Sequence, residues 1–322
     1  MSVGFDPGCI RLRIGFEGGR IDRVEVASER SAIAPRLRGR TADDAVRLVP
    51  LLFALCGQAQ GRAAALALAA ARGAEAAVQL DAAIQHEVMR EHLWRWLLDL
   101  PPLLGELAMR EEFVMAARRV AAGERDELRA LLSGPRIDAL RRRLVDIEDT
   151  TDPLRRLLPP LDARVSLAAW PRLDAEFCMT PQWQGAAAET GAFARRQGGD
   201  GAVTPAFSAR WLARLEELQD WASGGEKVGA GGTASAATTE RGRGRALVET
   251  ARGLLMHEIA LDGDRIADYF IVAPTEWNFH PQGPLAGWLI GRGATDRDAA
   301  RTFAARAVAT LDPCVRWELE WL

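Results

Sequence analysis

The chain has 322 residues and a nearly balanced charge, with a formal net charge of −3 at pH 7. This length indicates one large domain or two interlocked domains, and the lack of a basic excess argues against nucleic acid as a partner. No apolar run reaches the length of a membrane span, and the first residues lack the pattern of a secretory signal. Four cysteines in so long a chain do not make a disulfide framework, so we expect a cytoplasmic protein.

The predicted elements begin with a β-hairpin. Apolar side chains alternate with arginines over residues 10–16, and a glycine-containing turn precedes a returning strand over 21–26. Thr41 suits the N-cap position of a helix, and the apolar spacing after it predicts that this helix runs through Cys56. Gly57 then bends or ends the helix, and a second helical stretch follows.

The middle of the chain is predicted to be mostly helical. Residues 81–98 have a strongly helical pattern, which we expect the following pair of prolines to stop. Residues 103–121, 124–133 and 136–147 also favour helices, with glycine and proline between them. We therefore expect a mainly helical core.

Residues 223–244 differ from the rest of the chain in composition. They are rich in Gly, Ala, Ser and Thr, and such a segment buries too little apolar surface to offset its ordering entropy. We predict a flexible loop at 223–244, followed by a second hairpin over 253–272 and a helix over 296–310. Together these elements predict an α+β fold, a mainly helical core with small antiparallel hairpins, in a single domain over residues 1–322.

Two of the four cysteines have flanking sequence that points to a metal. A thiolate is a soft ligand for iron or nickel, although most lone cysteines are small buried apolar residues. We interpret Cys9 and Cys178, which have no flanking pattern, as buried residues of that kind. Cys56 and Cys314 each look like a Cys-x-x-Cys pair that has kept its first cysteine and lost its second.

The sequence around these cysteines resembles the large subunit of nickel–iron hydrogenases. The resemblance lies in six segments in the right order: Arg38-Gly39-Arg40, Cys56-Gly57, Glu189 to Arg195, Glu249 to Gly253 with His257, Val272 to Phe279, and Asp312-Pro313-Cys314. Each motif alone is weak, whereas six in order are strong. The resemblance covers nearly the whole chain and implies the fold of that large subunit.

The departures from the family pattern are informative. Ala59 and Trp317 stand where the family has the second cysteine of each pair, and in the family those cysteines bridge nickel and iron. Ala34 aligns with the family's proton-passing glutamate, and Glu320 stands at its C-terminal histidine, a ligand for a structural divalent ion. The chain stops at Leu322 without the extension that a protease removes in many members, so we expect no such processing.

This pattern is similar to that of the HupK- and HoxV-type accessory proteins of hydrogenase gene clusters. The resemblance implies a non-catalytic scaffold that transiently holds the Fe(CN)2CO unit, without nickel, and passes it to the hydrogenase large subunit. It also implies a HypC-like maturation chaperone as the partner that delivers the iron unit. Cys56 and Cys314 are the predicted metal ligands.

Arg252, Pro274 and Thr275 are the predicted cofactor-binding residues. In the family the counterpart of Arg252 lies against the diatomic ligands, and a guanidinium can donate to a cyanide nitrogen. The alternative is a buried arginine paired with Glu249 or Glu189. Pro274 and Thr275 resemble the stretch whose backbone and hydroxyl donate to cyanide, but Thr275 is equally consistent with an ordinary residue at a strand end.

The histidines carry less weight as ligands. His86 and His92 do not share a helix face, because their spacing corresponds to roughly 600° of rotation. We interpret His257 as structural within a strand and His280 as a residue that packs in a loop.

Two other functions are open at this point. One is a divergent hydrogenase-like enzyme with a mononuclear iron, against which the loss of two ligands counts. The other is a metal-free adaptor for the maturation chaperone. Retention of one cysteine at each end of the chain counts against the adaptor.

Overall fold

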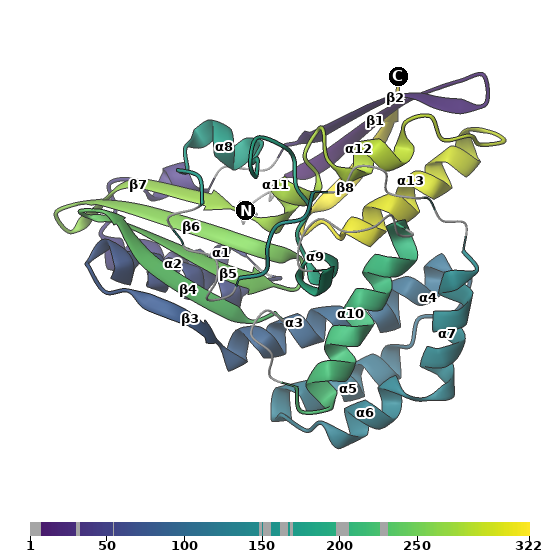
Figure 1. The fold of residues 1–322 in the computed structure, drawn as a ribbon, viewed down its shortest axis with the longest axis horizontal. Helices are drawn as coiled ribbons and strands as arrows, with labels where there is room; N and C mark the ends of the chain where they lie inside the picture. The colour runs from purple at the N-terminus through teal and green to yellow at the C-terminus, as the bar shows by residue number, and fades with distance from the viewer. Residues whose placement is uncertain are drawn as a thin grey trace, which may run out of the picture.

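The computed structural model describes residues 8–29, 33–53, 55–147, 150, 156–161, 167, 170–197, 206–225 and 231–322. A five-stranded sheet, a three-stranded sheet that contains the last strand, and a group of helices make up the fold (Figure 1). The arrangement confirms the predicted α+β class. None of the helices in these described ranges is long and apolar enough to cross a membrane.

The N-terminal hairpin pairs with the last strand of the chain. β1 (Cys9–Glu17) and β2 (Arg20–Ser28) are antiparallel, which confirms the first predicted hairpin. β8 (Arg316–Trp321) lies parallel to β1, with Arg316 opposite Cys9. The sequence pattern did not predict β8. Its pairing with β1 fixes the position of the segment just before it, which contains Cys314.

The larger sheet is antiparallel throughout. Its strands, in spatial order, are β3 (Ala76–Leu80), β4 (Thr233–Glu240), β5 (Arg243–Thr250), β6 (Gly253–Asp262) and β7 (Arg265–Val272). The β6–β7 pair is the second predicted hairpin, with a turn at Gly263, where φ is 59°. The sheet is wider than the isolated hairpins that the sequence suggested.

The helices surround the two sheets. In chain order they are the 3₁₀ helix η1 (Ala34–Leu37), α1 (Ala42–Leu52), α2 (Gly57–Ala71), α3 (Ala82–Trp94), the π-helical turn η2 (Arg95–Asp99), α4 (Leu100–Leu103), α5 (Arg110–Ala122), α6 (Asp126–Leu132), α7 (Pro135–Val145), α8 (Ala175–Met179), α9 (Ala192–Gln197), α10 (Ala206–Ala222), α11 (Pro274–Asn278), α12 (Pro284–Leu289) and α13 (Arg297–Leu311). Figure 1 shows α10 beside α3 and α5–α7 in a helical group at one end of the large sheet.

Two helix boundaries differ from the prediction. The first helix ends at Leu52, so Cys56 precedes α2 and does not lie inside α1. Pro101 and Pro102 do not stop the preceding helix but lie in the first turn of α4. A proline is tolerated there because the N–H groups of a first turn have no acceptor within the helix.

The predicted flexible loop at 223–244 is wrong where the structure describes it. Residues 233–240 form β4 and Arg243 begins β5, while residues 226–230 lie outside the described ranges. The small residues allow close packing instead. A Cβ added at Gly244 would lie 2.1 Å from the backbone nitrogen of Ala71 in α2. The segment buries its surface against strands and a helix that a local sequence window does not contain.

Two hydrophobic clusters support the two segments that carry Cys56 and Cys314. The larger joins α1, α2, α3 and α10 to the five-stranded sheet, with α2 directly against β5 and β6. The smaller joins the three-stranded sheet to α12 and α13. Cys56 precedes a helix of the first cluster, and Cys314 follows a helix of the second. Packing of the two clusters therefore determines how the two cysteines lie relative to each other.

Candidate functional site

Cys56 occupies the N-cap position of α2. The alanine-rich sequence of α2 lets the helix lie close to β5 and β6, and this packing fixes the start of the helix. The carboxylate of Glu87, from α3, accepts the backbone N–H groups of Gln58 at 2.9 Å and Ala59 at 3.2 Å. These two bonds satisfy N–H groups that a helix start leaves without partners, and so they hold Cys56 in place.

Cys314 is positioned by the break between α13 and β8. Asp312 ends α13 in the left-handed conformation, with φ 55°, and the chain then enters β8. The Thr275 hydroxyl oxygen accepts the Cys314 N–H at 3.4 Å and lies 3.1 Å from the Cys314 sulfur. Either group can donate while Cys314 is a protonated thiol. A thiolate has no proton, so the Thr275 hydroxyl is the donor once Cys314 is ionised.

The structure brings Cys56, Cys314 and Arg252 together. Burial raises the pKa of the Cys56 thiol to about 12, and a negative charge on Cys314 is the next largest cause of the increase. Arg252 acts on the same thiol in the opposite direction. Both cysteine charges in turn favour the charged form of Arg252. The N-cap residue of α2, a residue of the β5–β6 turn and a residue of the segment before β8 therefore form one electrostatic cluster.

Two buried carboxylates hold Arg252 in the β5–β6 turn. Its Nη2 lies 3.0 Å from Glu91 Oε2, and its Nε lies 3.3 Å from Asp312 Oδ1. Burial alone lowers the pKa of Arg252, but Asp312 and Glu91 outweigh it and raise the pKa above its ordinary value. Among the residues that the structure describes, no hydrogen bond from Nη1 of Arg252 is formed. A buried, permanently charged donor beside two thiols suits an anionic ligand.

The partners expected for Arg252 belong to other ion pairs. Glu249 Oε2 lies 3.0 Å from Arg195 Nη1, and Glu189 Oε1 lies 2.9 Å from Arg210 Nε. The alternative interpretation of Arg252 as a buried, paired arginine is thus wrong in its partners, since Arg252 pairs with Glu91 and Asp312. Glu91, which takes this role, lies in a helix whose sequence has no motif to mark it.

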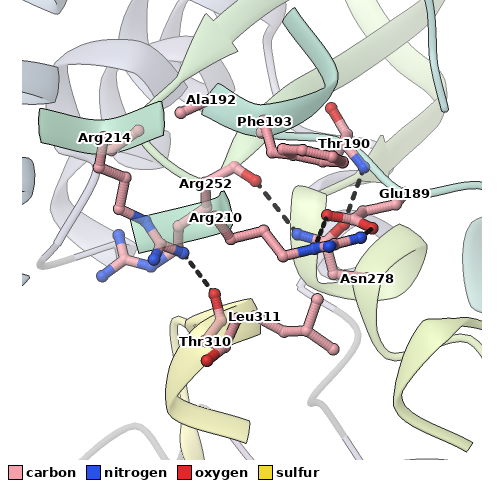
Figure 2. A pocket seen from close by; sticks show the side chains of 12 residues that line it. Glu189, Thr190, Ala192, Phe193, Arg210, Arg214, Arg252, Asn278, Thr310 and Leu311 are labelled. Atoms are coloured by element: carbon pink, nitrogen blue, oxygen red, sulfur yellow. Dashed lines mark hydrogen bonds and ion pairs between the residues drawn. The ribbon is translucent and has the colours of Figure 1, made fainter. Parts of the chain in front are cut away.

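Asn278 links three of the motif segments. Its Oδ1 accepts the Thr190 N–H at 2.9 Å, and its Nδ2 donates to the Arg252 carbonyl oxygen at 3.2 Å (Figure 2). Gly253 has φ 127°, and an added Cβ would lie 2.3 Å from Thr190 Cγ2. The glycine therefore lets the Arg252 turn pack directly against the segment that contains Thr190.

A small polar cavity lies beside this turn (Figure 2). Its volume is about 10 Å³, which is room for about one water molecule. Arg214 lines it and donates to the Thr310 carbonyl oxygen, while burial lowers the pKa of Arg214 to about 10. Of the described residues, none accepts a hydrogen bond from the buried Nη1 of Arg214. The cavity suits one water molecule and is too small for a cofactor.

Three residues stand where the hydrogenase family has metal ligands, and in this structure each has another role. Ala59 is fully buried in α2, and Trp317 lies in β8 opposite Ile10, against the smaller cluster. Glu320 forms ion pairs with Arg11 and Arg13, and a carboxylate between two guanidinium groups is unfavourable for a cation. Within the described residues there is no group of three or more His, Cys, Asp or Glu side chains that could hold a metal ion.

Pro274 begins α11, the helix that presents Thr275 to Cys314. It is buried in the first helical turn, where its fixed φ suits the start of a helix. The structure thus places Pro274 one residue before Thr275, next to the candidate site.

The remaining cysteines lie elsewhere. Cys9 lies in β1, with its sulfur 3.8 Å from a Glu29 carboxylate oxygen, and Cys178 lies in α8. Burial is the main cause of the raised pKa of both thiols. Neither cysteine lies in the segments that contain Cys56 and Cys314.

Gln60, which no sequence motif marks, also contacts Cys56. Its Nε2 lies 3.8 Å from the Cys56 sulfur, and its Oε1 lies 2.9 Å from His257 Nε2. Gln60 follows Cys56 by four positions, and on a helix this spacing places two side chains on one face. That spacing was a signal that could have been used. His257 lies in β6, as expected, but it is also connected to the site through this glutamine.

The fold is that of a nickel–iron hydrogenase large subunit. The chain is similar to the Ni-Fe-Se hydrogenase from Desulfovibrio vulgaris Hildenborough, with a TM-score of 0.64 at 15% identity over 93% of this chain and 94% of that chain. The Ni-Fe-Se hydrogenase from Desulfomicrobium baculatum gives a TM-score of 0.54 at 14% identity over 94% and 95%. Residues 202–316 match the profile of the nickel-dependent hydrogenase family.

Similarity to accessory proteins is higher and extends over the chain. The hydrogenase expression/formation protein HoxV of Cupriavidus necator is 33% identical over 96% of this chain and 95% of its own length. The hydrogenase expression/formation protein HupK of Rhizobium leguminosarum bv. viciae is 31% identical over 87% of each. The chain belongs to this HupK and HoxV family of hydrogenase expression/formation proteins, which confirms the resemblance seen in the sequence.

Proposed function

We propose that this protein takes part in hydrogenase formation as a non-catalytic scaffold that transiently holds the Fe(CN)2CO unit and passes it to the large subunit. The observation that carries the proposal is the meeting of Cys56, Cys314 and Arg252 from three separate segments. Membership in the hydrogenase expression/formation family supports a role in assembly.

The chemistry of the donor set suits an iron unit that already carries diatomic ligands. Two thiolates are soft ligands, and the diatomic ligands supply the remaining donors. The pKa of Cys56 lies at about 12, so the metal-free thiol is protonated near neutral pH and iron binding releases its proton. A site with two protein ligands is also open to exchange, which a donor of the unit requires.

Arg252 is the proposed partner of the cyanide ligands. Its charge is held beside the thiols by Glu91 and Asp312, and a guanidinium N–H can donate to a cyanide nitrogen. The Thr275 hydroxyl lies 3.1 Å from the Cys314 sulfur and donates to it when that sulfur is a thiolate, so in this proposal Thr275 orients a metal ligand. Pro274 contributes by starting the short helix that presents Thr275.

The same residues favour a carrier over an enzyme. Ala59 and Trp317 provide no bridging thiolates, so the chain lacks the ligands that enclose a nickel–iron pair, and we expect no nickel. Ala34 offers no carboxylate for a proton path. The proposed partners are a HypC-like chaperone, which delivers the iron unit, and the hydrogenase large subunit, which receives it. The proposed location is the cytoplasm.

An iron-transfer experiment tests this function. The protein is purified without oxygen from a host that expresses the maturation machinery and is supplied with isotopically labelled iron. It is then mixed with metal-free large subunit. We expect the label to move to the large subunit from wild-type protein and from the control Cys178→Ala, and to be absent from Cys56→Ala and Cys314→Ala.

Two results would contradict the scaffold. Iron-free wild-type protein that still binds the chaperone would identify a metal-free adaptor. Hydrogen uptake with an artificial electron acceptor would identify a hydrogenase-like enzyme.

A further inference from the structure

A continuous hydrogen-bonded chain of side chains connects Cys56 to the far strand of the large sheet. Gln60 Nε2 lies 3.8 Å from the Cys56 sulfur, and Gln60 Oε1 lies 2.9 Å from His257 Nε2. His257 Nδ1 lies 2.9 Å from the Tyr269 hydroxyl oxygen. The three side chains come from α2, β6 and β7, and their residues are 1%, 0% and 1% exposed. Buried polar side chains are nearly always hydrogen-bonded, and these three satisfy one another.

The direction of this chain follows from the chemistry of its members. Burial lowers the pKa of His257 to about 3, so its imidazole is neutral and has one donor and one acceptor nitrogen. The Gln60 carbonyl oxygen only accepts, so Nε2 of His257 carries the proton and Nδ1 is the acceptor. Tyr269 must then donate to Nδ1. Every proton in the chain points toward Cys56.

Tyr269 determines this direction. If the Gln60 amide were reversed, His257 would carry its proton on Nδ1 and donate to the Tyr269 oxygen. The tyrosine proton would then have no acceptor among the described residues, since His257 is the group in hydrogen-bond contact with this hydroxyl. Leaving a buried hydroxyl proton unbonded is unfavourable. The reversed amide would also direct its oxygen lone pairs at the sulfur, which repels a thiolate.

We propose that Gln60, His257 and Tyr269 form a directed relay that positions an amide donor on the Cys56 thiolate. The inference rests on the proposed function of Cys56 as a metal ligand. Hydrogen bonds to a ligating sulfur orient it and reduce the electron density that it gives to the metal. Thr275 supplies the matching donor when Cys314 is a thiolate. Each of the two sulfurs thus has one protein donor, which favours a thiolate ligand from which the iron unit can still leave.

The relay is tested in metal-free protein, so that its outcome does not depend on iron loading. Nitrogen NMR of histidine-labelled protein reads the tautomer of His257 directly, with His257→Gln used for assignment. We expect the proton on Nε2 and a hydrogen-bonded acceptor at Nδ1. In Tyr269→Phe we expect the chemical shift of Nδ1 to change to the value of an imidazole nitrogen that accepts no hydrogen bond. A proton on Nδ1 in the wild-type protein would overturn the proposed direction.

The effect on the sulfur is read from alkylation of Cys56 by iodoacetamide, followed by peptide mass spectrometry. Gln60→Leu removes the donor and keeps the shape, and we expect alkylation about tenfold slower at fixed pH. Gln85→Leu is the matched control, because Gln85 is also a buried glutamine but bonds Trp221, at 3.2 Å. Tyr269→Phe should also slow the alkylation of Cys56. This second variant keeps the test available if Gln60→Leu does not fold.

The two possible failures are distinguishable. Equal alkylation rates in Gln60→Leu and wild-type protein would overturn the relay and leave the iron scaffold standing. A correct His257 tautomer and a slowed Cys56, together with iron-free wild-type protein, would support the relay and overturn the proposed function.

Discussion

Asp312 is a buried carboxylate that pairs with two arginines. It is 5% exposed, and its Oδ1 lies 2.9 Å from Arg95 Nε and 3.3 Å from Arg252 Nε. Asparagine has nearly the same shape and also tolerates the left-handed backbone that Asp312 adopts, with φ 55°. Asp312→Asn therefore removes a buried charge without straining the backbone between α13 and β8.

The stability that Asp312→Asn is expected to lose is near the lower end of the range for breaking a buried ion pair. Removing one partner of such a pair costs about 3–5 kcal/mol, because the other charge stays buried without compensation. Here each arginine keeps a second carboxylate, Glu91 for Arg252 and Asp99 for Arg95. We therefore expect Asp312→Asn to lower the free energy of unfolding by about 3 kcal/mol, measured by urea denaturation.

The control is a carboxylate of the same type on the surface. Asp138 pairs with Arg141 and Arg142 on α7, and its side chain is 46% exposed. Asp138→Asn should cost less than about 1 kcal/mol. If Asp312→Asn costs no more than this control, the buried network does not hold the Cys314 segment.

The difference in free energy of unfolding between wild type and Asp312→Asn should depend on pH in a direction that the structure predicts. Burial raises the pKa of Asp312, but Arg252 and Arg95 outweigh it and lower the pKa below its ordinary value. A carboxyl group whose pKa is lower in the folded protein stabilises fully above its unfolded pKa and loses that effect as pH falls. The difference between wild type and Asp312→Asn should thus be constant near neutral pH and narrow only below about pH 4.

Three further predictions test the surroundings of the site. Gly244→Ala places a methyl group 2.1 Å from the backbone nitrogen of Ala71, so we expect a loss of about 3 kcal/mol or more, and an unchanged urea midpoint would contradict the close packing of α2 on β5. Cys314→Ala removes a sulfur whose negative charge, when it is ionised, raises the pKa of Cys56, so iodoacetamide should alkylate Cys56 faster at fixed alkaline pH; an unchanged or slower rate would argue against their proximity. Thr275→Val removes the donor to the Cys314 sulfur and should lower the stretching frequencies of bound CO and cyanide, with Thr275→Ser restoring them; equal frequencies in all three proteins would show that this contact does not reach the metal.

Local patterns predicted the elements whose partners are near in sequence. The alternation over residues 10–16 and 21–26 gave the β1–β2 hairpin, because the two strands are joined by one turn. The same holds for β6 and β7 around Gly263. β8 could not be found in this way, since it is stabilised by β1 from the other end of the chain.

The error at residues 223–244 has the same origin. Composition alone indicated too little apolar surface for order. The small residues instead allow β5 to approach α2, with the backbone of Ala71 close to Gly244. The surface that stabilises β4 and β5 belongs to neighbouring strands and to a helix far away in the sequence.

The candidate site was predictable in part, because the family resemblance marked its segments but not its charge partners. Cys56, Cys314 and Arg252 were singled out from motifs, and the structure places them in one cluster. Glu91 and Gln60 are not among the residues that match the family motifs. The packing of their helices brings them to the site.

Infrared spectroscopy can show whether Cys56 and Cys314 hold an iron unit with CO and cyanide ligands, as we propose. The protein is purified without oxygen from a host that expresses the maturation machinery. We expect bands of metal-bound CO and cyanide in the wild-type protein and in Cys178→Ala, and none in Cys56→Ala or Cys314→Ala. If wild-type protein bound to its chaperone shows no such bands, the two cysteines do not hold this iron unit.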